Sequence, residues 1–282
     1  MGQAMLWRGL VDDAAMFPPG NAPVAEAVAA HLDYRQAWFR DLIGPLVVAD
    51  QKLAEVSRTL GEGAEPLAVS VLNTGGAGGL VSLAGREIPT LQVTAVESAL
   101  RDLDDLAGNA ARVASAATAL DEAVRVFVEL PYAPGWERAV AEVEAAGLFG
   151  KIRTGSPDTA ETPTYDQLAS QLSVLVEADL PFKATAGLHH AWRSDGVDPA
   201  RPRQHGFLNL LAAIEALIEG AEKTDAVDLL ARADREAMRA SIAGWGDATA
   251  AKVRRRLVSF GCCGVLDPVD DLVGLGLVER PA

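Results

Sequence analysis

The sequence predicts an α/β fold, a single (β/α)8 TIM barrel, and three observations indicate it. Short segments rich in Val, Leu and Phe alternate with longer segments rich in Ala and Leu, the order expected of parallel strands with intervening helices. Eight such short segments can be marked, and eight strand–helix units favour a closed barrel over an open sheet. The length of 282 residues also suits one barrel, because these domains commonly have about 250 residues.

Each predicted element has a local reason. Segments such as 67–72 are apolar without regular alternation, as strands buried on both faces should be. The predicted strands are residues 10–13, 45–49, 67–72, 91–96, 124–130, 149–154, 182–186 and 257–262. Helical patterns lie between them at residues 24–42, 51–60, 78–85, 99–120, 136–146 and 165–178. The glycine-rich run 73–79 lacks the spacing of a phosphate-binding loop, so we interpret it as a tight turn, with or without ligand contact.

We expect one domain over residues 1–282, with an insertion in the last strand–helix unit. Residues 191–206 contain two prolines, three arginines and a histidine and predict an irregular loop directly after the seventh strand. Loops longer than about 12 residues in compact domains are often lids or binding loops. Residues 207–256 form a helical stretch too long for one helix, and we expect two or three helices there, inserted before the last strand.

Composition and charge exclude several function classes. The net charge of −14 argues against nucleic acid as a partner, because neutralising phosphates requires clustered Lys and Arg. The basic cluster 252–256 is short and is interpreted as a solvated helix end. No apolar run approaches the roughly 20 residues of a membrane span, and no secretion signal is apparent at the N-terminus. The adjacent Cys262 and Cys263 suit a reduced setting, so we expect a cytoplasmic protein. The expected partner is a small anionic substrate, and the sequence leaves homo-oligomerisation open.

Polar side chains near the strand ends are the candidate site, because barrel enzymes place their chemistry at the C-terminal ends of the strands. The candidates are Asp12, Asp13, Asp50, Asn73, Glu97, Glu129, Lys151, Arg153, Thr154, Lys183, Thr185, His189, His190, Ser259, Cys262 and Cys263. Adjacent carboxylates on a strand face opposite sides, so either Asp12 or Asp13 points inward, and Asp12 is preferred.

Lys151 and Lys183 are unusual because each lies within an apolar strand pattern, on consecutive predicted strands. Burial of an ammonium group lowers its pKa unless a carboxylate pairs with it. Two neighbouring lysines would lower each other's pKa further, which is one way to obtain a free amine that attacks a carbonyl and forms a Schiff base. The alternative is a buried ion pair with Glu129 or Glu97, or an amine that reaches the barrel rim.

These motifs resemble those of the deoxyribose-phosphate aldolase family. The segment FGKIRTG at 149–155 is similar to the sixth-strand Schiff-base motif, and FKATAGL at 182–188 is similar to the seventh-strand motif with its second lysine. The segments VFVE at 126–129, LVDD at 10–13 and GCCGV at 261–265 resemble the fifth, first and eighth strands of the family. The resemblance implies a cofactor-free class I aldolase in which Lys151 is the nucleophile and Lys183 lowers its pKa. Asp12 and Glu129 would order the network or move protons.

The sequence also departs from the family pattern. The fourth strand of the family ends in a proton-relaying Asp, whereas Glu97 is here the nearest carboxylate and is not at the matching place. Arg153 replaces a small hydroxyl residue, and Cys262 and Cys263 replace a Ser-Ser pair of the phosphate turn. These changes favour an anionic group such as a carboxylate, bound by Arg153 and His189. The predicted substrate-binding residues are Asn73, Arg153, Thr154, Thr185, Gly187, His189, His190, Gly261 and Cys262.

Two other functions remain open. His189, His190 and His205 follow the seventh strand in the sequence. They serve in acid–base chemistry, in a metal site or as capping residues, and the sequence leaves these alternatives open. A metal-assisted barrel enzyme would use Asp12, Glu97, Glu129 and His189 as ligands, with a lysine as base. A barrel without catalysis would simply bind a small molecule. The cysteines are interpreted as small strand-end residues, because nothing near them in the sequence marks an activating base.

Overall fold

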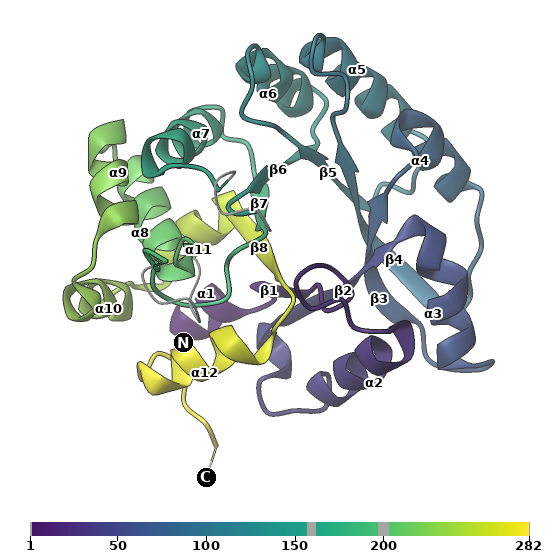
Figure 1. Cartoon of the computed structure of the whole chain (residues 1–282), viewed down its shortest axis with the longest axis horizontal. Coiled ribbons are helices and arrows are strands. Elements are labelled where there is room, and N and C mark those ends of the chain that lie inside the picture. The colour runs from purple at the N-terminus through teal and green to yellow at the C-terminus, as the bar shows by residue number, and fades with distance from the viewer. Residues whose placement is uncertain (1, 157–161, 197–202, 282) are drawn as a thin grey trace.

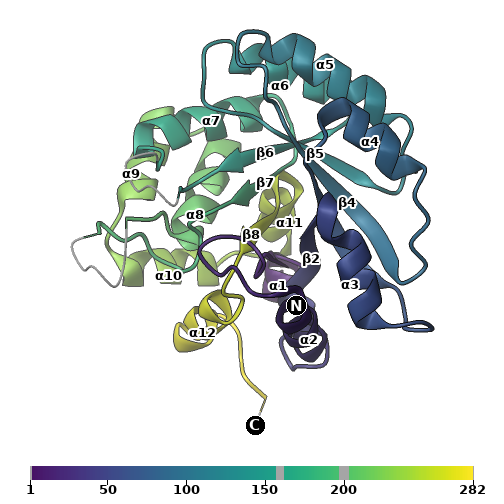
Figure 2. The same cartoon turned by 45° about the vertical axis from the view of Figure 1, so that its right-hand side comes forward.

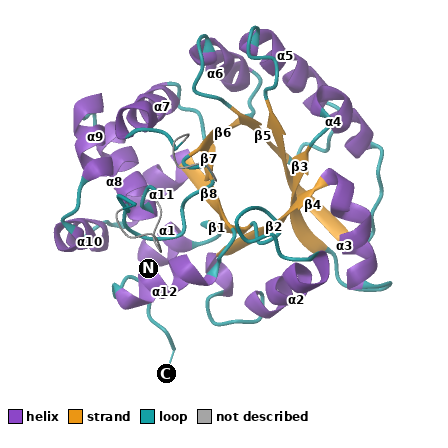
Figure 3. Ribbon diagram, viewed as in Figure 1, coloured by secondary structure: helices purple, strands orange, loops and turns teal. Residues whose placement is uncertain are grey.

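The computed structural model describes residues 2–156, 162–196 and 203–281. In this part of the chain, eight parallel strands close into a barrel in sequence order, with helices around it (Figures 1 and 3). The strands are β1 (Val11–Asp13), β2 (Ile43–Ala49), β3 (Leu67–Asn73), β4 (Leu91–Ala99), β5 (Arg125–Glu129), β6 (Phe149–Arg153), β7 (Phe182–Thr185) and β8 (Leu257–Cys262). The predicted (β/α)8 fold is therefore confirmed, and each strand lies at its predicted place.

Helices occupy the intervals between the strands. The sequence up to β7 contains α1 (Gly2–Trp7), α2 (Val24–Tyr34), α3 (Leu53–Leu60), α4 (Gly76–Ala84), α5 (Leu106–Ala117), α6 (Trp136–Ala145) and α7 (Tyr165–Glu177), with the 3-10 helices η1 (Arg40–Leu42) and η2 (Asp50–Lys52). Two predicted helices are shorter than expected. The helix predicted at 24–42 ends at Tyr34. The one predicted at 99–120 spans only Leu106–Ala117, because β4 continues to Ala99 and residues 100–105 form a loop.

The expected helical insertion lies between β7 and β8, and within the described residues it contains four helices rather than two or three. They are α8 (Phe207–Ile218), α9 (Lys223–Ala231), α10 (Arg235–Ala243) and α11 (Asp247–Arg256), and α12 (Leu266–Gly274) follows β8. Helix α8 packs directly on the barrel, where the ring of Phe207 stacks on that of Phe260 in β8 at 5.4 Å. Helices α9 and α10 pack on the outer side of α8 (Figure 2). Residues 197–202 of the predicted loop 191–206 lie outside the described residues.

The core has two layers that follow from the alternation of side chains along each strand. Val128, Ile152, Ala184 and Phe260 face the surrounding helices and are fully buried. Their neighbours one position away, such as Lys151 and Lys183, point into the barrel, because successive side chains alternate between the faces of a strand. The barrel interior near the C-terminal strand ends is therefore the place where the charged residues meet. No helix in the described ranges combines the length and the hydropathy needed to cross a bilayer.

Candidate active site

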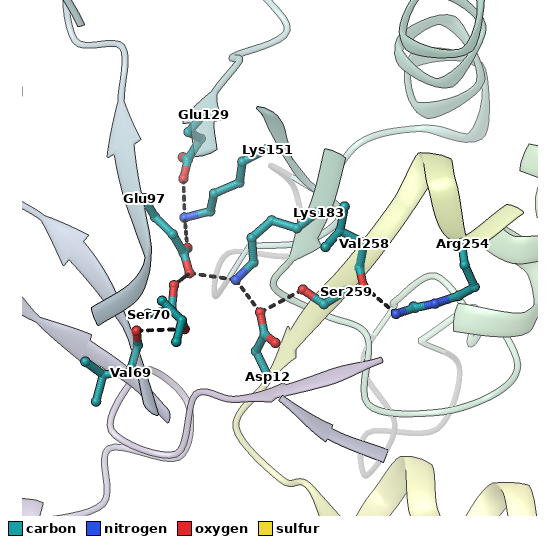
Figure 4. A network of polar contacts seen from close by, with 11 residues as sticks. Asp12, Val69, Ser70, Glu97, Glu129, Lys151, Lys183, Arg254, Val258 and Ser259 are labelled. Atoms are coloured by element: carbon teal, nitrogen blue, oxygen red, sulfur yellow. Dashed lines mark hydrogen bonds and ion pairs between the residues drawn. The ribbon is translucent and has the colours of Figure 1, made fainter. Parts of the chain in front are cut away.

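Five charged side chains form one buried network inside the barrel, which we call the lysine–carboxylate cluster: Asp12, Glu97, Glu129, Lys151 and Lys183 (Figure 4). Lys151 Nζ lies 2.8 Å from Glu97 Oε2 and 2.8 Å from Glu129 Oε2. Lys183 Nζ lies 2.6 Å from Glu97 Oε1 and 2.5 Å from Asp12 Oδ2. Glu97 thus bridges both ammonium groups, one with each carboxylate oxygen.

Strand register explains why these residues meet. Glu129 of β5 pairs with Lys151 of β6, Lys151 pairs with Lys183 of β7, and Lys183 pairs with Ser259 of β8. Glu97 enters from β4, and Asp12 enters from β1. A closed barrel brings these five strands around one axis, so that residues far apart in the sequence share one interior.

Second contacts hold the carboxylates in place. Ser70 Oγ donates a hydrogen bond to Glu97 Oε1 at 2.7 Å, and Ser259 Oγ donates one to Asp12 Oδ2 at 2.8 Å. Gly44 faces Asp12 so closely that a Cβ there would collide with Oδ1 of the carboxylate. The ammonium group of Lys183 also lies 5.4 Å from the ring centroid of Phe127, an arrangement that favours a positive charge.

The electrostatics of the cluster contradict the expectation that the two lysines lower each other's pKa. Burial by itself lowers the pKa of Lys151, but Glu97 and Glu129 outweigh it and raise the pKa above the ordinary value. Asp12 and Glu97 likewise outweigh burial and raise the pKa of Lys183. The buried ion pair that the sequence left open as an alternative is the arrangement that the structure shows.

Glu97 responds in the opposite direction. Its burial alone would raise the pKa of the carboxyl group, but the two lysines lower it well below the ordinary value. With three carboxylates and two ammonium groups, the cluster carries a net charge of −1 when every member is ionised. The side chains of Lys151 and Lys183 are nevertheless only 5% and 1% exposed. Their positive charges are therefore balanced by the neighbouring carboxylates and not by water.

A cavity of about 540 Å3 opens above the cluster at the C-terminal ends of the strands. Many of the predicted site residues line it: Asn73, Glu129, Lys151, Arg153, Lys183, Thr185, Gly187, His189 and Gly261. Other polar residues that line it include Glu97, Arg101, Arg203, Gln204 and Cys263. The loop between β1 and α2 contributes Phe17, Pro18 and Pro19 to its lining. The cavity therefore joins a buried charged floor to a largely basic rim.

Four predicted site residues are placed elsewhere. Asp12 lies behind Lys183 and reaches the cavity only through it. Thr154 is fully buried and donates its hydroxyl hydrogen to the carbonyl groups of Thr185 and Ala186. His190 belongs to a separate small pocket, where Nδ1 lies 3.3 Å from Asp271 Oδ2. Cys262 is buried, and its Sγ lies 3.3 Å from the Gly264 carbonyl oxygen. The structure therefore does not bring Thr154, His190 and Cys262 to the cavity.

The choice between the two adjacent aspartates is settled by their contacts. Asp12 reaches Lys183 inside the barrel, as preferred from the sequence. Asp13 points the other way, accepts a hydrogen bond from the Ala15 backbone N–H at 3.1 Å and lies 2.9 Å from His31 Nδ1 in α2. Asp13 therefore holds the base of the β1–α2 loop.

Glu97 is the central residue of the cluster, although the sequence analysis named it only as a strand-end candidate, a possible ion-pair partner and a metal ligand, and not among the catalytic residues. The predicted strand ended at Val96, whereas β4 continues to Ala99 and carries Glu97 inside the barrel. In the metal-assisted alternative, Asp12, Glu97 and Glu129 would bind a cation, but each of these carboxylates already contacts a lysine ammonium group. Among the described residues, no group of three or more His, Cys, Asp or Glu side chains is arranged to hold a metal ion.

Comparisons with known proteins assign the chain to no family. No protein-family model matches the chain, and no curated protein sequence does. Among solved structures, the carboxyl transferase domain of Rhizobium etli pyruvate carboxylase with pyruvate and biocytin is 16% identical, with a TM-score of 0.45 over 100% of this chain and 51% of that chain. A variant of Rhizobium etli pyruvate carboxylase with acetyl coenzyme A is 13% identical, with a TM-score of 0.46 over 100% of this chain and 27% of that one. The chain thus spans about half or less of these proteins.

Proposed function

We propose that this protein is a class I aldolase-like lyase that forms an imine between Lys151 and a small anionic carbonyl compound. The observation that carries the proposal is the position of Lys151, whose ammonium group lies at the cavity floor between Glu97 and Glu129. An amine held between two proton acceptors, in a cavity large enough for a small substrate, has the parts that covalent catalysis on a carbonyl requires.

The ion pairs define where the first proton goes. At rest Lys151 is an ammonium ion, so it must transfer one proton before it can attack. Glu129 is the acceptor we favour, because its side chain is 18% exposed and at the cavity surface, whereas that of Glu97 is 3% exposed and also bound to Lys183. The neutral amine then adds to the carbonyl carbon, and the carbinolamine loses water to give the imine. Glu129 is placed to return its proton to the departing hydroxyl group.

Lys183 has a different role from the one that the resemblance implied. Its raised pKa means that it stays protonated, and its contacts with Asp12 and Glu97 fix the orientation of the Glu97 carboxylate that also touches Lys151. We therefore assign Lys183 to positioning, as a permanent cation that keeps Glu97 ionised beside the reacting amine.

The rim of the cavity supports an anionic substrate. Arg101, Arg153 and Arg203 line it, and a guanidinium group binds a carboxylate through two parallel hydrogen bonds. Arg153 lies close to the reacting groups, because its Nη1 is 3.8 Å from Glu129 Oε1. An anion at Arg153 would place a neighbouring carbonyl group toward Lys151.

A second candidate follows from the raised pKa values of both lysines. Ammonium groups that stay protonated stabilise an enolate without a covalent bond, while a carboxylate removes the α-proton. Such an enzyme would exchange the α-hydrogens of a keto acid with solvent deuterium but form no imine.

Borohydride trapping separates these functions. The protein is incubated with glyceraldehyde, glyoxylate, pyruvate or 2-oxobutyrate, treated with sodium borohydride and mapped by peptide mass spectrometry. We expect an adduct on Lys151, none on the half-exposed surface residue Lys52, and none in the Lys151→Arg variant, which keeps the charge but cannot form an imine. Deuterium exchange without an adduct would support the second candidate. The absence of both adduct and exchange with every compound would overturn both.

A further inference from the structure

Cys263, His189 and Asp267 form a second reactive group at the rim of the cavity, which we call the thiol–imidazole–carboxylate group. Cys263 Sγ lies 3.5 Å from His189 Nε2, and His189 Nδ1 lies 3.2 Å from Asp267 Oδ2. Cys263 and His189 both line the cavity, whereas Asp267 stands behind the imidazole in α12. Nucleophile, base and orienting carboxylate are therefore in the order that activates a thiol.

The two neighbouring cysteines are not equivalent in this arrangement. Cys262 is 2% exposed, and its thiol donates to the Gly264 carbonyl oxygen at 3.3 Å. Burial raises the pKa of Cys262 and keeps it protonated. Cys263 is only partly buried and faces both the cavity and the imidazole. The reactive sulfur is therefore that of Cys263.

The imidazole is held in the state that this role needs. Asp267 accepts a hydrogen from Nδ1, which leaves Nε2 to exchange a proton with Cys263. The contacts with the sulfur atoms of Cys262 and Cys263 raise the pKa of His189 to about 11. His189 is therefore protonated at neutral pH and can give its Nε2 proton to the oxygen of a carbonyl compound in the cavity.

Two close backbone approaches indicate that the group is built into the fold. A Cβ on Gly264 would lie 2.6 Å from Asp267 Oδ2 and 3.6 Å from His189 Nδ1, so only glycine leaves room for the contact between the imidazole and the carboxylate. A Cβ on Gly20 would lie 3.0 Å from the Cβ of Cys263. The β1–α2 loop therefore packs against Cys263.

We propose that Cys263 is a nucleophilic thiol that adds reversibly to the carbonyl carbon of a small aldehyde in the cavity. The protonated His189 donates its Nε2 proton to the carbonyl oxygen while the sulfur–carbon bond forms and the carbonyl π bond breaks, and the proton of the thiol then replaces it on Nε2. The product is a hemithioacetal. No group leaves and no oxidant or reductant is consumed, so the step balances with the residues present. Asp267 is a positioning residue that acts through His189.

This activity is separate from imine formation, because it uses a different nucleophile from a different strand end. The reaction at Cys263 does not require Lys151. We infer an aldehyde as the substrate class because hemithioacetal formation requires only a thiol, a proton-transferring group and a carbonyl group.

The first test compares the two cysteines by iodoacetamide alkylation and peptide mapping between pH 6 and 9.5. In the wild type, we expect Cys263 to react at least tenfold faster than Cys262 at pH 6.5. The same difference is expected between the Cys262→Ala variant, which keeps only Cys263, and the Cys263→Ala variant, which keeps only Cys262. His189→Gln should slow Cys263 about tenfold at pH 6.5 and little at pH 9.5, where solvent alone ionises a thiol. Asp267→Asn should move the pH profile of Cys263 alkylation toward that of a free thiol. A wild-type profile with its midpoint near pH 8.5, unchanged in His189→Gln, would overturn the proposal.

The second test uses glyoxylate and propionaldehyde as the probes. Each aldehyde should protect Cys263 from alkylation in a saturable way, equally in the wild type and in Lys151→Arg. Protection that disappears in Lys151→Arg would mean that the imine shields the thiol, which would support the proposed lyase and overturn hemithioacetal formation. Protection without any borohydride adduct would support the thiol chemistry while the lyase proposal fails.

Discussion

Replacing Glu97 by Gln is expected to lower the free energy of unfolding by about 3–5 kcal/mol, the usual cost of removing one partner from a buried ion pair. Glu97 is 2% exposed and pairs with Lys151 at 2.8 Å and with Lys183 at 2.6 Å, so two ammonium groups each lose a charged partner. The amide oxygen can still accept one hydrogen bond, but the amide NH2 group meets the other lysine as a second donor. For 282 residues this loss corresponds to a melting temperature lower by roughly 5–8 °C.

The assay is thermal and urea unfolding followed by circular dichroism at pH 7. Glu55→Gln is the matched control, because Glu55 pairs with Lys52 at 2.8 Å while the two side chains are 43% and 54% exposed. Exposed ion pairs contribute about 0–1 kcal/mol, so this control should lose no more than that. Equal losses in the two variants would refute the conclusion that the lysine–carboxylate cluster stabilises the barrel.

The pH dependence gives a second check on the same variant. Because Lys151 and Lys183 lower the pKa of Glu97 against the effect of burial, its stabilisation is complete above the unfolded-state pKa and is lost as the pH falls. Below about pH 4.3, the difference between wild type and Glu97→Gln should shrink by about 1.4 kcal/mol per pH unit. A difference that stays constant down to pH 3 would contradict the ion-pair assignment.

Further predictions concern residues outside the cluster. Gly79→Ala should lower the unfolding free energy, measured by urea denaturation, by about 1–3 kcal/mol, because its Cβ would collide with Asn73. Gly78→Ala in the same helix meets no atom within 4 Å and should raise the unfolding free energy by about 0.5–1 kcal/mol. Thr164→Ala should lower the unfolding free energy by about 1 kcal/mol, because Thr164 forms the capping box of α7, and similar urea midpoints for both proteins would contradict this. Burial lowers the pKa of His205 to about 4, so wild-type stability should fall by about 1.4 kcal/mol per unit from pH 6.5 toward pH 4, a slope that is absent in a His205→Gln titration.

The strands could be predicted from the sequence because parallel strands buried on both faces have a strong local pattern. β8 was predicted with its exact bounds, residues 257–262, and the other strands differ only at their ends. The errors arise where tertiary contacts override local propensity. β4 runs on to Ala99 beside β5, which no local signal in the segment indicates. The insertion likewise divides into four helices through packing against α7 and α8.

The site was partly predictable for the same physical reason. Lys151 and Lys183 are conspicuous because an ammonium group within an apolar strand requires a special environment. Their partners come from β1, β4 and β5, and only the closed register determines that Glu97 lies between them. The direction of the pKa shifts depends on this charge balance, which explains why two lysines considered alone gave the wrong sign. The thiol–imidazole contact is equally remote in sequence, since Cys263 and His189 are 74 positions apart.

The sharing of Glu97 by two lysines also limits how this barrel can diverge. A lineage that loses Lys183 alone keeps a buried Asp12 without a cation and leaves Glu97 with Lys151 alone. A lineage that loses Asp12 alone leaves the Lys183 ammonium group short of one anion. Either path crosses a less stable intermediate, whereas exchanging both residues together for apolar side chains of similar volume does not. Descendants of this fold should therefore change these positions in compensated pairs, and a homologue with an apolar residue at the Asp12 position should also have lost the Lys183 amine.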